Sequence, residues 1–253
     1  MLLDCADLSY TRGSGDQAFR VLIASLTLDL GEIIALTGES GCGKSTALEL
    51  LGLVVRPTDA GRFRLTVDGA PRDIAALWRS GEQGALARLR AAALGFVLQT
   101  GGLLPYLRVA DNIGINRRLL RLPARDPDLD AIVDQLQLGP LLAHWPSQLS
   151  VGQYQRACIA RALAHHPRLV LADEPSSALD PRLGEEVMGL FLHLVEHLGT
   201  GVVIATHELG RMRTRGLREV QALPLAAGLG SVFDGSPGPV RGAGADACAQ
   251  ERS

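Results

Sequence analysis

Apolar and polar residues alternate in three segments near the start of the chain, in the way expected of strands with one buried face. These segments are Leu2 to Tyr10, Val21 to Leu30 and Phe63 to Asp68. Because successive side chains of a strand point to opposite faces, this period of two predicts an antiparallel layer. Between the second and third segments, an apolar run from Glu32 to Thr37 enters a glycine-rich loop, and Ser45 to Val55 then has helical spacing. The pattern therefore predicts strand, glycine loop and helix in direct succession.

Continuous apolar runs predict a second kind of strand further along the chain. Leu94 to Gln99, Arg168 to Ala172 and Val202 to Ala205 have no polar alternation, which is typical of parallel strands covered on both faces. Residues 100–165 have a helical pattern interrupted by Gly and Pro, and a further amphipathic helix has its apolar face between Val187 and Leu198. These elements predict an α/β fold with a parallel core, an antiparallel β subdomain and an α-helical subdomain.

The domain boundaries follow from the same pattern and from composition. We expect one domain over residues 1–226, with the helical subdomain at about 100–165 inserted in the core. Residues 227–253 are rich in Gly, Ala and Pro and offer little to bury, so we expect a mostly disordered tail. We also expect removal of the chain from Gly230 onward to leave the fold intact.

Charge and hydropathy limit where the protein can work. The formal net charge is -2, so there is no basic excess that would make nucleic acid the main partner. No apolar stretch reaches the roughly 18 residues that a transmembrane helix needs. The first ten residues lack the basic region of a signal peptide. We therefore expect a cytoplasmic protein that does any membrane work through a partner.

The glycine-rich loop matches the phosphate-binding P-loop pattern. Its residues are Gly38, Glu39, Ser40, Gly41, Cys42, Gly43, Lys44, Ser45 and Thr46. The glycines let the backbone curl so that N–H groups point at phosphate oxygens, and the helix that follows adds the positive end of its dipole. In this pattern Lys44 reaches the β- and γ-phosphates of ATP and the Ser45 hydroxyl binds Mg²⁺. The flanking strand and helix supply the context that the pattern requires.

Lysine usage adds weight to this interpretation. The chain has 25 basic residues, and Lys44 is the only lysine among them. A compact ammonium fits beside phosphate oxygens where a wide planar guanidinium does not. We interpret Lys44 as a lysine kept for its shape in a chain that otherwise uses arginine.

Two acids follow the apolar run that ends at Ala172. Asp173, at the carboxyl end of a predicted strand, can hold Mg²⁺ opposite Ser45. The next residue, Glu174, can take a proton from an attacking water. Two acids after a strand are often only a solvated turn, but their combination with a P-loop favours a catalytic pair.

A second anion site is predicted at Leu149 to Gln153. Ser150 is suited to cap the helix that begins after it, and the free N–H groups at that helix end attract negative charge. Taken alone, the segment indicates only a capped helix.

Together with Gln99, His207 and the run Ser177-Ala178-Leu179-Asp180, these segments resemble the ABC ATPase family, with six motifs in the family's order from about Leu2 to about Arg211. The resemblance implies a P-loop NTPase (RecA-like) core that binds ATP and Mg²⁺. It implies that Tyr10 stacks on adenine, that Gln99 touches Mg²⁺ or the attacking water, and that His207 contacts the γ-phosphate. The implied catalytic residues are Glu174, Lys44, His207 and Gln99, and the implied metal ligands are Ser45, Gln99 and Asp173.

The resemblance also implies a second copy of the chain. Two chains would pack head to tail with two-fold symmetry around two ATP molecules. Ser150, Gly152 and Gln153 would contact the γ-phosphate of ATP held by the opposite subunit, and Asp180 would cross the interface. Two departures from the family pattern stand out: Val151 replaces a glycine of the signature, and the segment from Glu208 to Gly216 is unusually rich in Arg. We expect Val151, which also removes the option of positive φ, to loosen this contact.

The stretches Leu89-Arg90, Leu94 to Gln99 and Leu103 to Leu107 resemble the lipoprotein-release and macrolide-export branch of the family. This implies a transmembrane permease partner that docks near Gln99 to Tyr106, on the cytoplasmic face of the inner (plasma) membrane. A complex that signals or remodels an envelope assembly without moving a substrate stays open as an alternative. A soluble DNA-repair relative would need a long coiled-coil insertion between Gly43 and Ser150, and a translation relative would need a second cassette; the chain has neither.

Overall fold

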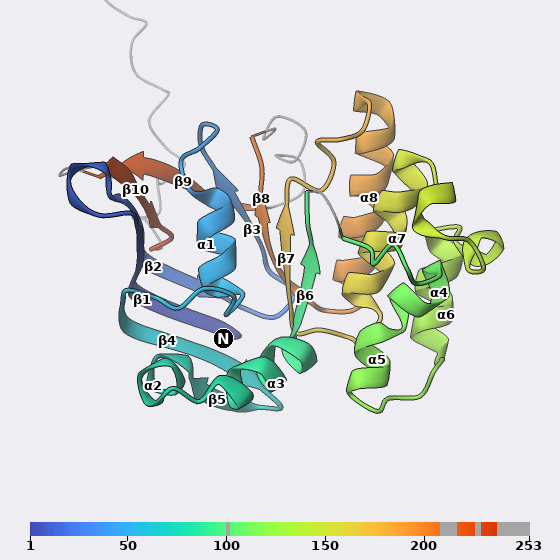
Figure 1. Ribbon diagram of the computed structural model, residues 1–253, viewed down its shortest axis with the longest axis horizontal. Helices are drawn as coiled ribbons and strands as arrows, with labels where there is room; N and C mark the ends of the chain where they lie inside the picture. Colours follow the sequence, from blue (N-terminus) through green and yellow to red (C-terminus); the bar gives the residue numbers. More distant parts are fainter. Residues whose placement is uncertain (100–101, 208–216, 226–228, 237–253) are drawn as a thin grey trace, which may run out of the picture.

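A ten-stranded mixed sheet forms the centre of the molecule in the computed structural model (Figure 1). The structure describes residues 1–99, 102–207, 217–225 and 229–236. The strand order is β5-β4-β1-β2-β10-β9-β3-β8-β7-β6, so one half of the sheet is largely antiparallel and the other half is parallel. The strands are β1 Leu3–Arg12, β2 Phe19–Leu28, β3 Ile33–Thr37, β4 Asp59–Val67, β5 Ala70–Asp73, β6 Leu94–Val97, β7 Leu169–Asp173, β8 Gly201–Ala205, β9 Arg218–Pro224 and β10 Leu229–Asp234.

Helices cover both faces of the parallel half. The α-helices are α1 Lys44–Leu51, α2 Ile74–Ser80, α3 Gln83–Ala93, α4 Val109–Ile113, α5 Ile115–Leu119, α6 Pro127–Gln135, α7 Val151–Leu163 and α8 Pro181–His197. Helices α4 to α7 gather beyond the β6 edge of the sheet. Helix α1 lies over the middle of the sheet, next to β3 (Figure 1). Helices α4 to α7 all lie within residues 100–165, the range in which the sequence predicts a helical subdomain.

The apolar runs of the parallel strands supply two cores at once. Leu169 and Leu171 of β7 pack into the cluster that contains α1 and the antiparallel strands. Val170 and Ala172, the residues that follow them on β7, pack into the cluster formed by α4, α6, α7 and α8. All four are buried. This is why β7 has no polar alternation, as the sequence predicts for a strand covered on both faces.

Two predicted elements end earlier than expected. The predicted helix to Val55 ends as α1 at Leu51, because Gly52 caps it and Leu53 adopts a left-handed φ of 57°. The predicted strand to Gln99 ends as β6 at Val97. Gln99, two residues after the end of β6, lines the site described below.

The expectation of a disordered tail is wrong for residues 229–234. These residues form β10, which pairs in parallel with β2 and antiparallel with β9. Phe233 of this strand is fully buried, so a single aromatic side chain gives the glycine-rich segment an apolar anchor. Residues 237–253 of the predicted tail, and the Arg-rich segment from Glu208 to Gly216, lie outside the described residues.

An arginine on β9 connects the chain segments around these two interior strands of the sheet. The Nε of Arg218 donates to Glu32 Oε1 at 2.7 Å, and its guanidinium also donates to the carbonyls of Gly235, at 2.7 Å, and Thr27. The contacts join β9 to the segment before β3, to the end of β2 and to the residue after β10. β9 and β10 are therefore integral to the sheet.

We expect Phe233→Ala to lower the free energy of unfolding by about 3 kcal/mol, because it leaves a cavity where a buried ring packs. Urea denaturation followed by circular dichroism measures the change. Leu229→Ala is the matched control, since Leu229 lies on the same strand and is 51% exposed. For the same reason we expect removal of the chain from Gly230 onward to destabilise the fold. Equal stability of the two point variants would contradict the role of β10.

Candidate nucleotide site

The glycine-rich loop between β3 and α1 has the backbone conformation that its sequence predicts. Gly38, Gly41 and Gly43 have φ values of 148°, 81° and 94°, a region that side chains with a Cβ rarely adopt. Gly43 also serves as the N-cap of α1, so the loop ends directly in the helix. The free N–H groups of the first turn of α1 therefore face the space that the loop encloses.

Lys44 is held inside this loop by the loop's own backbone. Its Nζ donates to the carbonyl of Gly38 at 2.9 Å and to that of Glu39 at 3.0 Å, and the residue is buried. The Nζ also lies 4.0 Å from Cys42 Sγ, and because sulfur is a weak acceptor, the third N–H donor of the ammonium can turn to an anion in the loop. The contacts fix the positive charge at the position that the sequence predicts for the phosphates.

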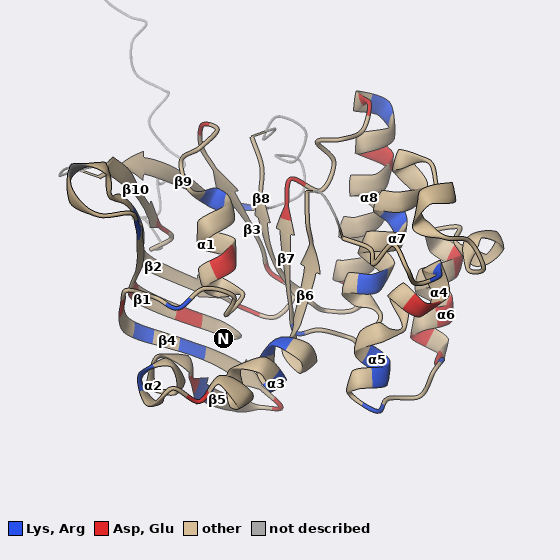
Figure 2. Ribbon diagram, viewed as in Figure 1, with Lys and Arg blue, Asp and Glu red and all other residues tan. Residues whose placement is uncertain are grey.

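The acidic end of β7 lies across from the basic start of α1, at the same edge of the sheet (Figure 2). Asp173 accepts a hydrogen bond from the Ser45 hydroxyl. Burial raises the pKa of Asp173 above its usual value, even though this hydrogen bond and the charge of Lys44 oppose the shift. A carboxylate and a hydroxyl at one point are oxygen ligands of the kind that Mg²⁺ prefers. The donor set therefore fits the predicted metal.

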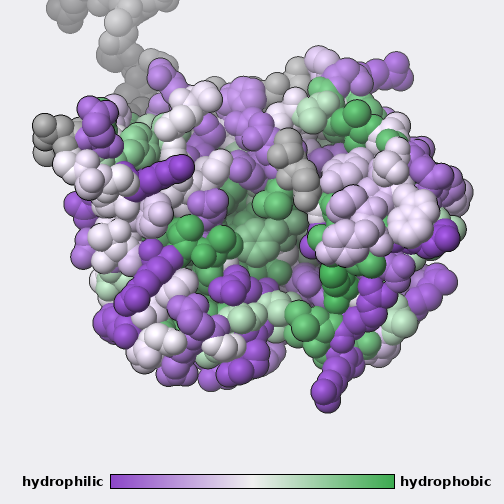
Figure 3. Space-filling model, in the orientation of Figure 1, coloured by the Kyte–Doolittle hydropathy of each residue, from purple (hydrophilic) through white to green (hydrophobic). Residues whose placement is uncertain are grey.

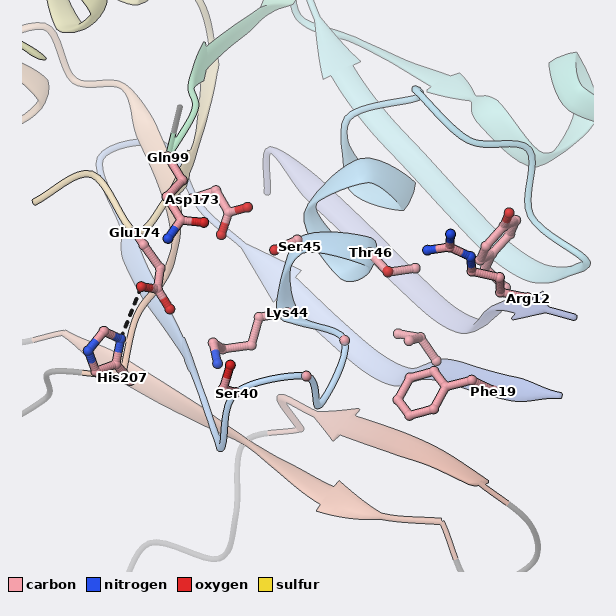
Figure 4. A pocket seen from close by; sticks show the side chains of 14 residues that line it. Arg12, Phe19, Ser40, Lys44, Ser45, Thr46, Gln99, Asp173, Glu174 and His207 are labelled. Atoms are coloured by element: carbon pink, nitrogen blue, oxygen red, sulfur yellow. Dashed lines mark ion pairs between the residues drawn. The ribbon is translucent and has the colours of Figure 1, made fainter. Parts of the chain in front are cut away.

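Glu174 follows in a conformation that points it at His207. It has a φ of 44°, and its N–H donates to the carbonyl of Ala205 at the end of β8, at 2.9 Å. Its Oε2 lies 3.1 Å from Nδ1 of His207 (Figure 4). Glu174 is mostly shielded from solvent, whereas the His207 side chain is half exposed. The strained backbone thus places a carboxylate and an imidazole together beside the loop.

Gln99 reaches the same region from the end of β6. Its Nε2 lies 3.4 Å from the Ser177 hydroxyl, which donates to the carbonyl of Glu174 at 3.0 Å. Through Ser177, the side chain of Gln99 is linked to the backbone of the proposed general base.

One cavity of about 730 Å³ collects most of the predicted residues. Those that line it are Tyr10, Ser40, Gly41, Gly43, Lys44, Ser45, Thr46, Gln99, Asp173, Glu174 and His207. Gly38, Glu39 and Cys42 belong to the loop without lining the cavity, although the Gly38 and Glu39 carbonyls hold Lys44. Sequence analysis missed three lining residues, Arg12, Phe19 and Val21. The available signal was alternation, because Arg12 lies two positions after Tyr10 on the same strand.

The residues predicted to contact the nucleotide of a second copy lie outside this cavity; they are Ser150, Gly152, Gln153 and Asp180. Ser150 caps α7: its hydroxyl accepts from the Gln153 N–H at 3.3 Å, and Gln153 Oε1 accepts from the Ser150 N–H at 2.9 Å. Gly152 has no room for a Cβ, which would lie 2.7 Å from the Leu183 side chain. Asp180 caps α8 by accepting from the Leu183 N–H at 3.1 Å. None of the four lines the cavity described above.

Val151 is the first residue of α7, and its side chain is 59% exposed. The residue has helical backbone geometry, with no positive φ. This chain therefore uses no positive φ at this position, and the expectation that Val151 loosens the contact with the second copy stays a prediction. Its exposed methyl groups remain as a steric feature at the start of the helix.

Comparison with known proteins decides the family. A family model described as ABC transporter matches residues 22–177. The chain belongs to the ABC transporter family. The match spans the glycine loop, the helical region and the acids after β7, and it confirms the predicted family and the ATPase class.

Relatives and solved structures agree with this assignment. The macrolide export ATP-binding/permease protein MacB of Shigella flexneri is 38% identical over 215 residues, which are 82% of this chain and 31% of that protein. MacB of Rhodospirillum rubrum is 37% identical over 242 residues, 94% of this chain and 35% of that protein. The chain thus spans about a third of the length of these curated relatives.

A dimeric, post-hydrolysis structure of the ATP-binding cassette MJ0796, bound to ADP and Pi, is similar with a TM-score of 0.72 and 29% identity. The match covers 87% of this chain and 94% of that one. The predicted fold class, a P-loop α/β core with a β layer and helices, is confirmed. Among the described residues, no helix combines the length and apolar character needed to cross a membrane.

Proposed function

We propose that this chain is the ATP-binding and ATP-hydrolysing subunit of an ABC transporter-type membrane complex, with Glu174 as its general base. The observation that carries the proposal is the shared cavity: the buried ammonium of Lys44, the Ser45–Asp173 pair and the Glu174–His207 pair all line it. This is the set of charges that phosphoryl transfer to water requires.

Each residue would have a separate task in hydrolysis. The loop N–H groups and Lys44 hold the β- and γ-phosphates, and His207 contacts the γ-phosphate. Ser45 and Asp173, with Gln99, would hold Mg²⁺, which neutralises phosphate charge when bound. Glu174 accepts the proton of the attacking water, and its contact with His207 keeps the carboxylate turned toward the cavity.

A second copy of the chain would complete the site. Ser150, Gly152, Gln153 and Asp180 are needed at the γ-phosphate in the family pattern, but here they cap or pack helices away from the cavity. A head-to-tail dimer would bring the start of α7 of one subunit to the nucleotide of the other. The similar MJ0796 cassette is described as dimeric.

A transmembrane partner would dock in a groove between the sheet and the helices, in which apolar residues lie beside Arg90, Asn116 and Arg161. This groove, of about 360 Å³, adjoins Gln99 and is lined by Val54, Leu94, Phe96, Leu98, Gly102 and Ala162 among others. Val54 and Leu98 are 54% and 44% exposed, and hydrophobic side chains gather around a hollow in the middle of this face (Figure 3). We place the chain on the cytoplasmic side of the inner membrane, as the soluble partner of a permease. The curated relatives named above are themselves ATP-binding/permease proteins.

Phosphate release from ATP by the purified chain, with and without Mg²⁺, tests the enzymatic half of the proposal. We expect Mg²⁺-dependent release that rises more than linearly with protein concentration, because two chains must meet. Affinity purification of the tagged chain from detergent-solubilised membranes tests the other half, with a co-purifying transmembrane protein as the expected result. An absence of hydrolysis at high protein concentration would contradict the proposed activity.

We expect Val151→Ala to raise the hydrolysis rate of the isolated chain several-fold, because it removes two exposed methyl groups from the surface that would meet the partner subunit's nucleotide. Relief of one crowded contact is worth roughly 1–3 kcal/mol. Alanine is preferred to glycine because it keeps the helix start rigid. Steady-state phosphate release at matched concentrations measures the effect. An unchanged rate would mean that valine is accommodated without cost.

A further inference from the structure

The end of the cavity away from Glu174 is built by four side chains of β1 and β2. Tyr10 and Arg12 lie two positions apart on β1, and their direct partners on β2 are Val21 and Phe19. Alternate residues of a strand share a face, and direct cross-strand partners lie side by side. The four therefore form one continuous patch, and all of them line the cavity. Only Tyr10 was predicted from the sequence.

This patch is in contact with the phosphate loop. A Cβ at Gly43 would lie 2.5 Å from Val21 Cγ2 and 3.3 Å from Phe19 Cε1. The loop backbone therefore packs directly on the patch. If the phosphates of a molecule occupy the loop, the rest of that molecule extends from the loop over the patch.

Arg12 is the charged member of the patch. Among the described residues, no hydrogen bond or ion pair involves its side chain. The guanidinium end points back toward Thr46, the last residue of the P-loop pattern (Figure 4). Lys44 is the other described residue with a full positive charge that lines the cavity. It lies at the opposite end of the cavity, together with the carboxylates of Asp173 and Glu174. Of the described residues that line the cavity, Arg12 is thus the cation with no carboxylate beside it.

We propose that Arg12 binds the α-phosphate of the nucleotide. The inference rests on the proposed function, because it needs the β- and γ-phosphates to be in the loop. A planar guanidinium can donate two parallel hydrogen bonds to phosphate oxygens. Since Lys44 serves the reacting end, a second cation beside Thr46 offsets the charge at the other end of the phosphate chain.

The position of this contact fixes its kinetic signature. Hydrolysis leaves the α-phosphate unchanged, so Arg12 binds the substrate and the transition state equally. Loss of such an interaction raises KM and leaves kcat unchanged. It also weakens ADP as much as ATP, unlike the loss of a contact to the γ-phosphate.

Competition binding separates the α-phosphate from the other parts of the nucleotide. A fluorescent ADP analogue is titrated onto the wild-type chain and onto Arg12→Gln, and is then displaced by adenosine, AMP, ADP or ATP. We expect the affinities for AMP, ADP and ATP each to fall by about tenfold in the variant, as one charged contact is lost, with adenosine unchanged. Steady-state hydrolysis should show the rise in KM at constant kcat.

Arg20→Gln is the matched control. Arg20 lies on β2 next to Phe19, but it interacts with Ser9 and Asp59 instead of lining the cavity. It should bind all four compounds as the wild type does. Arg12→Lys keeps the positive charge but lacks the paired N–H donors of a guanidinium. If Arg12 contacts the phosphate directly, this variant should recover only part of the nucleotide affinity that Arg12→Gln loses. If Arg12 acts only through its charge at long range, Arg12→Lys should recover all of that affinity. Full restoration would overturn the proposed contact.

The remaining outcomes are distinct. Equal loss for adenosine would place Arg12 on the base or ribose and overturn the α-phosphate contact. Unchanged affinities in Arg12→Gln, with a wild-type chain that binds ATP, would overturn this inference and leave the proposed function standing. A wild-type chain that binds no nucleotide would overturn both.

Discussion

Lys44→Ala should lose ATP binding by about a hundredfold or more, because the phosphate loop loses its ammonium and the carbonyls of Gly38 and Glu39 lose their partner. Titration with a fluorescent ATP analogue measures the loss. Arg88→Ala is the control: it also removes one positive charge, from an exposed position on α3. A thermal melt of each variant shows whether the loop change stays local. Near-normal affinity in Lys44→Ala would contradict the assignment of the loop as the phosphate site.

Lys44→Arg asks whether the shape of the cation matters as well as its charge. The ammonium lies within 3.0 Å of two loop carbonyls and is buried, so a guanidinium has to displace one of these contacts. We expect binding to fail nearly as completely as in Lys44→Ala. Near-normal affinity would mean that the only lysine of the chain was not retained for its shape.

The features that sequence analysis predicted depend on residues close together in the chain. The P-loop is nine consecutive residues, and Asp173 and Glu174 are neighbours at the end of one apolar strand. Residue type and spacing alone indicate such sites, and here the structure brings both to one cavity. The catalytic and ligand roles assigned to these residues stay predictions.

The features that sequence analysis missed depend on pairing between distant segments. Arg12 and Phe19 join the cavity because β1 and β2 pair in a particular register, and no local pattern sets that register. β10 is a strand because β2 and β9 offer it open edges and because Phe233 finds a buried position there. In a segment rich in Gly, Ala and Pro, composition outweighed that one aromatic residue in the prediction.

The interpretation of Val151 shows a different limit. The motif alone does not give the backbone conformation of residue 151, which is the first residue of a helix and has no positive φ. At the next position packing favours glycine, because a Cβ at Gly152 would lie 2.7 Å from the end of the Leu183 side chain. The distinction depends on the packing of α7 against α8, which the motif does not contain.

Glu174→Gln should still bind ATP but hydrolyse it about 10²–10⁴ times more slowly, since a general base is lost. The substitution keeps the shape of the side chain, and the amide oxygen can still accept a hydrogen bond from His207 Nδ1. The backbone contact of residue 174 with Ala205 is unaffected. The expected loss therefore isolates proton transfer from the geometry of the site. Phosphate release under single-turnover conditions measures it.

The same variant tests whether ATP holds two chains together. If hydrolysis opens the proposed dimer, blocking hydrolysis should trap it, so Glu174→Gln should elute as a dimer in Mg-ATP and as a monomer without nucleotide. Light scattering coupled to size-exclusion chromatography gives the mass directly. Glu186→Gln, which removes an exposed carboxylate of α8, should behave as the wild type. A slow but monomeric Glu174→Gln would keep Glu174 as the base and remove the second copy from the mechanism. A variant with normal turnover would remove Glu174 from it.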